Sequence, residues 1–334
     1  MSPDRFLSRT LERFEREASR GGVTQLDRLV AGVHVRLRVA GEPLAERLLE
    51  GLFSFPVADP GSEPAATFSV YDSASGGDVP PSPPWGEGDY LPRDEVRGFT
   101  HGRWRASYSL MHSTLWFYDA ESSRGAGWMR EPPSPAARER AVPFWPAFNW
   151  VLAQNGRPLT HAAAVGEVLL VGPGGTGKST TCLVAAAAGL PCAGDDYVVL
   201  SEEAGGEAWT AHALYRWARL VEESMQRLPA LRAVYWDGEK SGVELPGQVE
   251  SMPVRAVLLP RVAERTGRPR PLPRAVVARA LTPSTLIQGA GTDPGVAGML
   301  GRMLRSVPTL GLDVGPDIDR IPDALGEAVE MVAA

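Results

Sequence analysis

The sequence predicts an α/β protein in which a C-terminal domain with a mixed sheet follows a smaller α+β N-terminal module. Short apolar runs typical of strands alternate with segments of helical periodicity. Proline-rich stretches interrupt the first half, and the composition changes at Arg157. The predicted organisation is therefore an N-terminal module over 1–130, a connecting helix within 131–156 and a C-terminal domain over 157–334.

Composition limits the classes of partner. The chain has 334 residues, 43% of them hydrophobic, and a formal net charge of -6, which favours neither nucleic acid nor an anionic membrane as a partner. The first twenty residues mix charged with apolar side chains and have no apolar core of a signal peptide, so we expect a cytoplasmic location. Cys182 and Cys192 lack the close Cys/His pairs of zinc sites, and we expect two reduced, buried thiols.

The N-terminal module begins with apolar residues at helical spacing, which predict a helix over 4–19. Alternation predicts a strand over 34–40 and another over 66–72, and the segment 43–52 reads as a helix with proline in its first turn. The Pro/Gly/Ser-rich stretch 73–88 is a predicted loop.

Two further segments complete the first half. The near-alternating, aromatic-rich run 98–119 predicts two or three antiparallel strands whose Trp and Tyr side chains belong to the sheet core. After it, the spacing of Phe144 and Phe148 predicts a helix over 135–154, which Pro143 and Pro146 are expected to kink.

In the second half, the apolar runs 161–165 and 168–172 are separated by Gly166 and Glu167, which predicts a tight hairpin. The second run leads into a predicted helix over 178–188 that Gly189 can cap. A last helix is predicted over 322–333, closing one side of the C-terminal domain.

The stretch GPGGTGKST, 172–180, matches the phosphate-loop pattern GxxxxGK[ST] between a strand and a helix. Backbone N–H groups and the helix N-terminus make such a loop a site for ATP phosphates. Lys178 should reach the β- and γ-phosphates, and Ser179 should bind Mg²⁺. The predicted nucleotide-binding residues are Gly172, Pro173, Gly174, Gly175, Thr176, Gly177, Lys178, Ser179 and Thr180.

The pair Asp195 and Asp196 should return to the level of this loop. A helix of about 16 Å, at about 1.5 Å per residue, is followed by an extended run that climbs back by about 20 Å, at about 3.3 Å per residue. Adjacent side chains of an extended chain face opposite sides, so one carboxylate would face the nucleotide, to bind the metal or to accept a proton. An Asx turn or a helix cap is the alternative interpretation.

The ordered set of His161, the loop, Gly189 and CAGDDYVVL resembles the catalytic domain of HPr kinase/phosphorylase and its stand-alone relatives, whose P-loop fold is akin to phosphoenolpyruvate carboxykinase. The 18 residues from Lys178 to Asp196 agree with that family. The resemblance covers about 157–330, where ALYRWARL, LTPSTLIQG and LGLDVGPDIDRIPDAL also look like the relatives, and it omits the first 130 residues.

The resemblance implies roles for four residues. Asp196 would be the base that accepts the proton of the attacking serine hydroxyl, and Lys178 would stabilise the transferred phosphoryl group. His161 would hold the aspartate or the acceptor, and its alternative is a hydrogen-bonded core histidine. Asp195 would bind Mg²⁺ together with Ser179. HPr kinases assemble as oligomers, so the resemblance also implies a homo-oligomer.

The chain departs from true HPr kinases after the aspartate pair, where the glycine-rich signature with its second metal-ligand glutamate is missing. Recognition of HPr and the reverse phosphorylase reaction are therefore not implied. Glu222 and Glu223 are either replacement ligands or an exposed helix face, and Arg216, Arg219 and Lys240 either reach phosphates and an acidic substrate or are solvated charges.

Three functions are compatible with these residues. The first is an ATP-dependent kinase of a hydroxyl, most plausibly serine on a peptide or small protein, and the stand-alone relatives that accompany peptide-modifying gene clusters favour it. The second is a kinase of a free small-molecule alcohol or amino acid. The third is a nucleotide-binding regulatory protein without catalysis.

Overall fold

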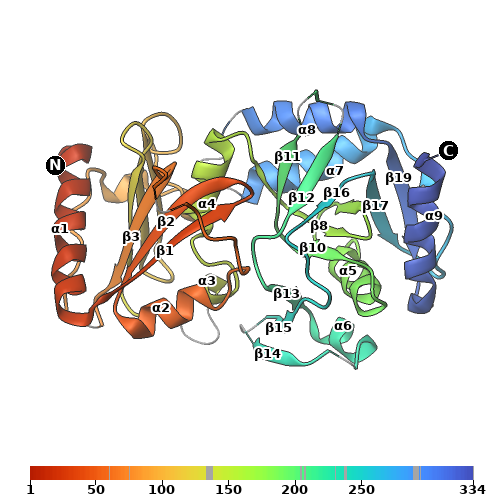
Figure 1. The fold of residues 1–334 in the computed structure, drawn as a ribbon, viewed down its shortest axis with the longest axis horizontal. Coiled ribbons are helices and arrows are strands. Elements are labelled where there is room, and N and C mark those ends of the chain that lie inside the picture. The colour runs from red at the N-terminus through yellow and green to blue at the C-terminus, as the bar shows by residue number, and fades with distance from the viewer. Residues whose placement is uncertain are drawn as a thin grey trace. The chain divides into compact units, whose positions relative to one another are not determined.

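The fold is described from a computed structural model. It describes all residues except 60, 75, 133–137, 204, 207, 230, 237–238, 289–292, 294 and 334, and the side chains of 138, 139 and 288 are also outside the description. The chain is a mixed α/β protein that divides into two compact units (Figure 1). The first comprises 1–155 with 289–293, and the second comprises 156–288 with 294–334. Among the described residues, no helix has the length and apolar character needed to cross a bilayer.

The first unit is built on a mixed sheet in the order β1-β2-β3-β6-β5-β4. β2 and β6 both run parallel to β3, and the remaining pairs are antiparallel. The strands are β1 Val23–Val30, β2 Val33–Ala40, β3 Ala66–Asp72, β4 Trp104–Ser109, β5 Thr114–Asp119 and β6 Arg124–Met129. The sequence predicted β2 and β3 close to these bounds, and the antiparallel strands expected within 98–119 are β4 and β5. It missed β1 and β6.

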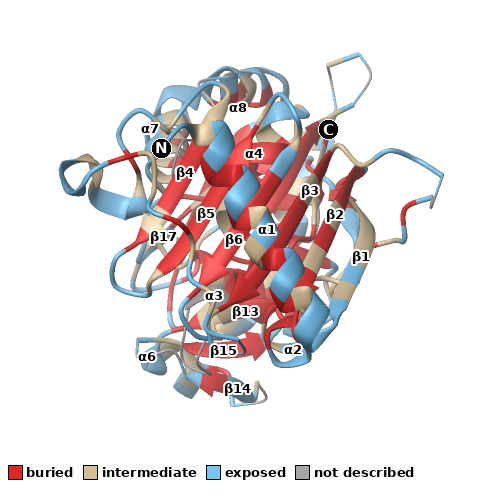
Figure 2. Cartoon of the chain, turned by 90° about the vertical axis from the view of Figure 1, so that its left-hand side faces the viewer, coloured by how far each residue is buried: buried red, intermediate tan, exposed pale blue. Residues whose placement is uncertain are grey.

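Helix α1 (Pro3–Gly21) covers one face of this sheet (Figure 2). The Ser2 hydroxyl caps it by accepting a hydrogen bond from the backbone N–H of Arg5 at 3.4 Å. Phe6 and Phe14 are fully buried, and Phe6 meets the ring of Phe117 edge-on at 4.9 Å. Helix α2 (Glu42–Leu49) connects β2 to β3, and the short helices η1 (Glu87–Asp89) and η2 (Pro92–Asp94) lie in the segment before β4.

The other face of the sheet carries the rings of Trp116 and Tyr118, which meet Phe144 and Trp150. The predicted helix over 135–154 is wrong as one element, because α3 (Arg138–Ala141) and α4 (Trp145–Gln154) are separate helices. Phe144 between them has a left-handed φ of 56°, and Pro143 precedes it, so the backbone cannot continue as one helix. Residues 135–137 of that prediction lie outside the described residues.

The second unit has a mixed sheet in the order β10-β8-β9-β17-β19-β18. β9, β17 and β19 are parallel, and the other neighbours are antiparallel. The strands are β8 Ala162–Val165, β9 Val168–Val171, β10 Cys192–Gly194, β17 Ala256–Val262, β18 Arg270–Pro271 and β19 Thr309–Val314. The predicted hairpin is confirmed, with Gly166 and Glu167 both at positive φ, as a tight two-residue turn requires.

Helices α5 (Lys178–Ala187) and α9 (Ile321–Ala333) pack on this sheet in one apolar core, and both match the predicted helices. Gly189 follows α5 with φ 97°, the left-handed conformation expected of a helix terminator. α7 (Arg274–Gln288) contacts β9 and β17 and packs against α8 (Gly295–Ser306). The short helix η3 (Ile318–Arg320) precedes α9.

Two smaller sheets complete the second unit. One has the order β16-β12-β11-β7, and the other has the order β13-β15-β14 with α6 (Glu222–Arg227) beside it in the chain. Their strands are β7 Leu159–Thr160, β11 Val198–Glu202, β12 Trp209–His212, β13 Trp217–Leu220, β14 Ala233–Trp236, β15 Ser241–Glu244 and β16 Ser251–Pro253.

Candidate functional site

The glycine-rich loop lies between β9 and α5, as the motif predicts. Gly172, Gly175 and Gly177 have φ values of 139°, 81° and 96°, which side-chain-bearing residues rarely adopt. A Cβ at Gly172 would also lie 2.9 Å from Leu259. Gly177 is the N-cap of α5 and provides no side-chain cap, so the first backbone N–H groups of the helix are left for a ligand.

Lys178 is folded back onto this loop. The residue is 6% exposed, and Nζ donates to the carbonyl oxygens of Gly172 at 2.7 Å and Pro173 at 3.1 Å. Burial lowers the pKa of Lys178, while the carboxylates of Asp195 and Asp196 act in the opposite direction. The loop thus holds a cation whose hydrogen bonds are to neutral carbonyls, which an anionic ligand could replace.

Asp195 is 2% exposed, and within the described part of the chain neither of its carboxylate oxygens accepts a well-formed hydrogen bond. Burial, followed by the charge of Asp196, raises the pKa of Asp195 to about 6. The Ser179 hydroxyl and Lys178 lie near enough to favour the charged form. A buried carboxylate with free lone pairs beside a serine hydroxyl offers the oxygen ligands that a hard divalent cation prefers.

Asp196 occupies a strained turn. Its φ is 67°, and the backbone N–H of Tyr197 donates to the carbonyl oxygen of Asp195 at 2.8 Å, which closes a γ-turn around it. The expectation of an extended chain through the pair is therefore wrong, because β10 ends at Gly194 after a register irregularity. A Cβ at Gly194 would lie 3.2 Å from the Tyr197 carbonyl oxygen, so glycine relieves a tight contact in this turn.

The side chain of Asp196 contacts His161. Nε2 of His161 lies 3.1 Å from Oδ1 of Asp196, and an Arg219 guanidinium nitrogen lies 3.9 Å from Oδ2. Burial raises the pKa of Asp196, but the His161 contact and the charges of Lys240 and Arg219 lower it by more. The pKa of Asp196 is therefore below its ordinary value. With 21% of its side chain exposed, Asp196 is an ionised carboxylate that solvent or a substrate can reach.

Strand register explains why these residues meet. The chain over 159–165 and the chain over 192–202 run antiparallel, pairing as β7 with β11 in one sheet and as β8 with β10 in another. His161 and Asp196 lie where both chains change sheets. Across the hairpin, Ala162 pairs with Val171, so His161 also lies opposite Gly172, the first residue of the loop.

His161 has the contacts of a positioned side chain. It is 5% exposed, its backbone N–H donates to Oγ1 of Thr285 at 3.4 Å, and its ring lies 5.8 Å from that of Tyr197. Nδ1 has no hydrogen-bond partner among the described residues, so Nε2 is the nitrogen through which the imidazole acts on Asp196.

Other residues singled out in the sequence lie elsewhere. Glu222 and Glu223 are exposed on the first turn of α6, and Glu223 pairs with Arg227 at 2.5 Å. Arg216 pairs with Glu244 at 2.6 Å. Thr180 contacts the Ser224 hydroxyl at 3.1 Å, so its side chain turns toward α6 and away from the loop.

Contacts from distant parts of the chain were not foreseen. Thr285 on α7 reaches His161 across 124 residues. Cys182 on α5 and Cys192 on β10 are free and buried, and their sulfurs lie 3.5 Å apart. Cys192 lies shortly before the aspartate pair in the chain. No local pattern in the sequence signals either contact.

The described residues contain no cluster of three or more His, Cys, Asp or Glu side chains that could hold a metal ion by themselves. Mg²⁺ does not require such a cluster at nucleotide sites, where one or two protein ligands act together with phosphates and water. The unpaired Asp195 oxygens and the nearby Ser179 hydroxyl fit that donor set.

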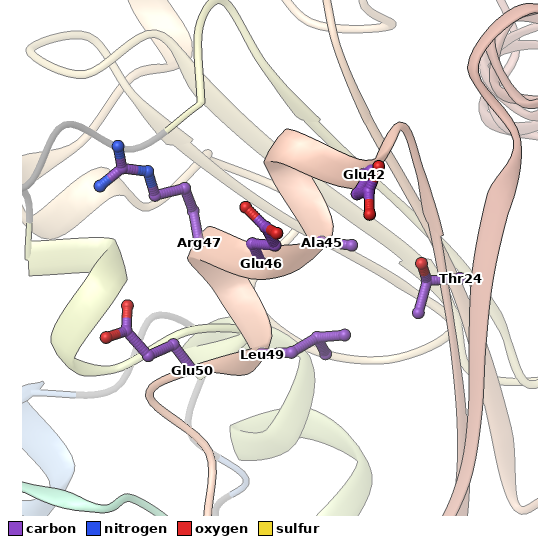
Figure 3. A pocket seen from close by; sticks show the side chains of 7 residues that line it. All are labelled: Thr24, Glu42, Ala45, Glu46, Arg47, Leu49 and Glu50. Atoms are coloured by element: carbon purple, nitrogen blue, oxygen red, sulfur yellow. The ribbon is translucent and has the colours of Figure 1, made fainter.

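Two arrangements in the first unit lack this chemistry. A hollow of about 600 Å³ over α2 is lined by Glu42, Glu46 and Glu50, with Arg47 as its cation, so it is acidic and repels phosphate (Figure 3). A row of contacts joins Asp27 to His34 and His34 to Ser62. The Ser62 hydroxyl lies 2.8 Å from both His34 Nδ1 and the Asp59 carbonyl oxygen, so this row of contacts contains no cation that would bind phosphate in the manner of Lys178.

Comparison with solved structures finds the HPr(Ser) kinase/phosphatase from Coxiella burnetii, with a TM-score of 0.28 and 11% sequence identity, covering 52% of this chain and 89% of that chain. No protein-family model matches this chain, and no curated protein matches it. A TM-score this low does not establish a common fold, so the residues of the site carry the functional conclusion.

Proposed function

We propose that the protein is an ATP-dependent phosphotransferase that moves the γ-phosphoryl group of ATP to a hydroxyl, with serine of a peptide or small protein as the acceptor. The observation that carries this proposal is the convergence of an ionised, partly exposed Asp196 with a buried Lys178 at the glycine-rich loop. A phosphate loop explains Lys178 alone. The loop does not explain why the Asp196 carboxylate lies beside Lys178, whereas a role in accepting the proton of the attacking hydroxyl does.

In the proposed reaction, backbone N–H groups at the start of α5 bind the phosphates, and Lys178 exchanges its carbonyl partners for the β- and γ-phosphates. Asp196 accepts the acceptor's O–H hydrogen bond and then its proton. The acceptor oxygen bonds to phosphorus as the bond from phosphorus to the ADP oxygen breaks. A base of low pKa suffices because the transition state of phosphoryl transfer is loose, so positioning and charge neutralisation supply most of the rate.

Ser179 and Asp195 are the residues that would hold Mg²⁺, whose charge would neutralise the phosphates. His161 would fix the orientation of the Asp196 carboxylate through Nε2. Arg219 and Lys240 would keep that carboxylate ionised.

The test supplies the acceptor as a library of serine peptides, with γ-labelled ATP and Mg²⁺. Wild type should label serine peptides and leave their alanine counterparts unlabelled. Asp196→Asn should bind ATP within about threefold of wild type and lose between about 10² and 10⁴ in transfer rate. Transfer by Asp196→Asn at the wild-type rate would refute the assignment of the base. Nucleotide binding with no transfer to peptides or to a panel of small alcohols would identify a nucleotide-binding protein without catalysis.

A further inference from the structure

The sheet face that carries Trp116 is incompletely filled at one end. Side chains alternate along β4 and β5, so Ser107, Ser109 and Thr114 share this face with Trp116. Small hydroxyl side chains stand where large apolar ones would complete the packing against α4. A cavity of about 210 Å³ remains there, and its apolar walls include Trp116, Met129, Phe144 and Trp145.

One polar group on the cavity wall lacks a partner. Ser109 is 5% exposed, and its Oγ forms no hydrogen bond with any described residue. A buried hydroxyl left in this state destabilises the empty cavity. The position opens into the cavity, so an occupant with a hydrogen-bonding group would satisfy it.

Size and charge limit the occupant. Pockets for whole small molecules measure about 300–1,000 Å³, and a space of about 210 Å³ is closer to a single aromatic side chain. The described lining contains no lysine or arginine, and its ionisable members, Asp94 and His112, are exposed at the rim. Among the described residues a phosphate or nucleotide would therefore find no counter-charge, and a neutral amphipathic group fits.

The rim indicates that the aromatic group belongs to a longer chain. Met111 lines the mouth and is 87% exposed, and Leu110 beside it on the turn between β4 and β5 is 66% exposed. Flexible apolar side chains around a deep pocket suit a peptide that inserts an anchor residue and lays its neighbours on the rim. We propose that this cavity binds a tyrosine-like side chain of a peptide, with Ser109 as its hydrogen-bonding partner. The proposal does not depend on phosphoryl transfer.

The experiment uses the full chain labelled with 5-fluorotryptophan and no nucleotide. N-acetyl-Ala-Tyr-Ala-amide should shift the fluorine resonances of Trp116 and Trp145, assigned through their phenylalanine variants, and leave the other tryptophans unmoved. N-acetyl-Ala-Ala-Ala-amide should cause no shift. 4-Methylphenol, the free side chain, should bind at least about tenfold more weakly than the tyrosine peptide. Equal binding of 4-methylphenol, or an equal response to the alanine peptide, would overturn the proposal.

Three variants test the cavity itself. Ser109→Leu fills the space and should weaken the tyrosine peptide at least about tenfold, whereas Ser109→Ala keeps the space and should weaken it about three- to tenfold through loss of the hydroxyl. Ser82→Leu makes the same change at an exposed position and should bind like wild type. Wild-type affinity in Ser109→Leu overturns the proposal. If the fluorine spectrum shows that Ser109→Leu is unfolded, the test passes to Ser109→Ala, and wild-type affinity for the tyrosine peptide in that variant overturns the proposal.

Discussion

His161 and Asp196 are 35 residues apart in the chain and meet at 3.1 Å between Nε2 and Oδ1, at the point where two antiparallel chains pass from one sheet to another. The contact joins a buried imidazole to a carboxylate held in a γ-turn. Its chemical effect is to favour the ionised form of Asp196.

Removing the imidazole should change the pH dependence of transfer. The His161 contact lowers the pKa of Asp196, so His161→Phe should raise that pKa and move the acidic limb of the kcat/KM profile to higher pH. The acidic limb of His161→Gln, which can keep a hydrogen bond to Asp196, should lie between those of His161→Phe and wild type. Identical acidic limbs in all three proteins would make His161 a core histidine without influence on the base.

Replacing the loop lysine should act on nucleotide binding. Lys178→Met keeps the length of the side chain and removes the charge, so ATP affinity should fall by at least about tenfold, or ~1.4 kcal/mol. Arg216→Met is the matched control, because Arg216 is a partly exposed cation that pairs with Glu244. Isothermal titration with MgATP measures both variants. Equal affinities for Lys178→Met and wild type would contradict the role of the loop.

Asp195 is expected to destabilise the fold at neutral pH. Its pKa is raised to about 6 from an ordinary 3.8, so the cost of burying its charge is present above pH 6 and disappears below about pH 4. In magnesium-free buffer at pH 7.5, Asp195→Asn should raise the free energy of unfolding by up to about 3 kcal/mol. The same variant should lose the further stabilisation that MgATP gives wild type. Urea unfolding of both proteins at pH 7.5 and pH 4 measures the difference in their free energies of unfolding. A variant less stable than wild type at pH 7.5 would contradict the prediction.

His212 should make stability fall in acid. Burial, and then the charge of Arg157, lower the pKa of His212 to about 4 from an ordinary 6.5. The neutral ring, which contacts the Ser201 hydroxyl at 2.8 Å, contributes stability above pH 6.5 that is lost as the pH falls toward 4, up to about 3 kcal/mol. His212→Asn should therefore show a flatter dependence of the urea midpoint between pH 7 and pH 4.5. The exposed His101→Asn serves as the control and should follow wild type.

The sequence was informative where local physics decides the structure. Glycines with positive φ, a lysine and a helix start can be recognised within nine residues, and the loop before α5 has that form. The γ-turn at Asp196 could not be predicted, because it follows a register irregularity in β10 that depends on pairing with β8. The contact of Thr285 with His161 depends on where α7 packs, which no local pattern encodes.

The missed strand β6 has a different physical reason. Its sequence, RGAGWM, contains two glycines, which usually mark a turn. In the sheet, a Cβ at Gly125 would lie 2.2 Å from the Phe68 ring, and one at Gly127 would lie 2.9 Å from the Trp116 ring. The glycines therefore leave room for aromatic rings on neighbouring strands, a tertiary requirement that propensity does not contain.

The hairpin of β8 and β9 also fixes the position of the imidazole relative to the glycine-rich loop. His161 and Gly172 stand at its open end, fixed by the pairing of Ala162 with Val171, while Gly166 and Glu167 form the far tip. A two-residue slip of one strand would carry the histidine about 7 Å along the sheet and separate the two halves of the site.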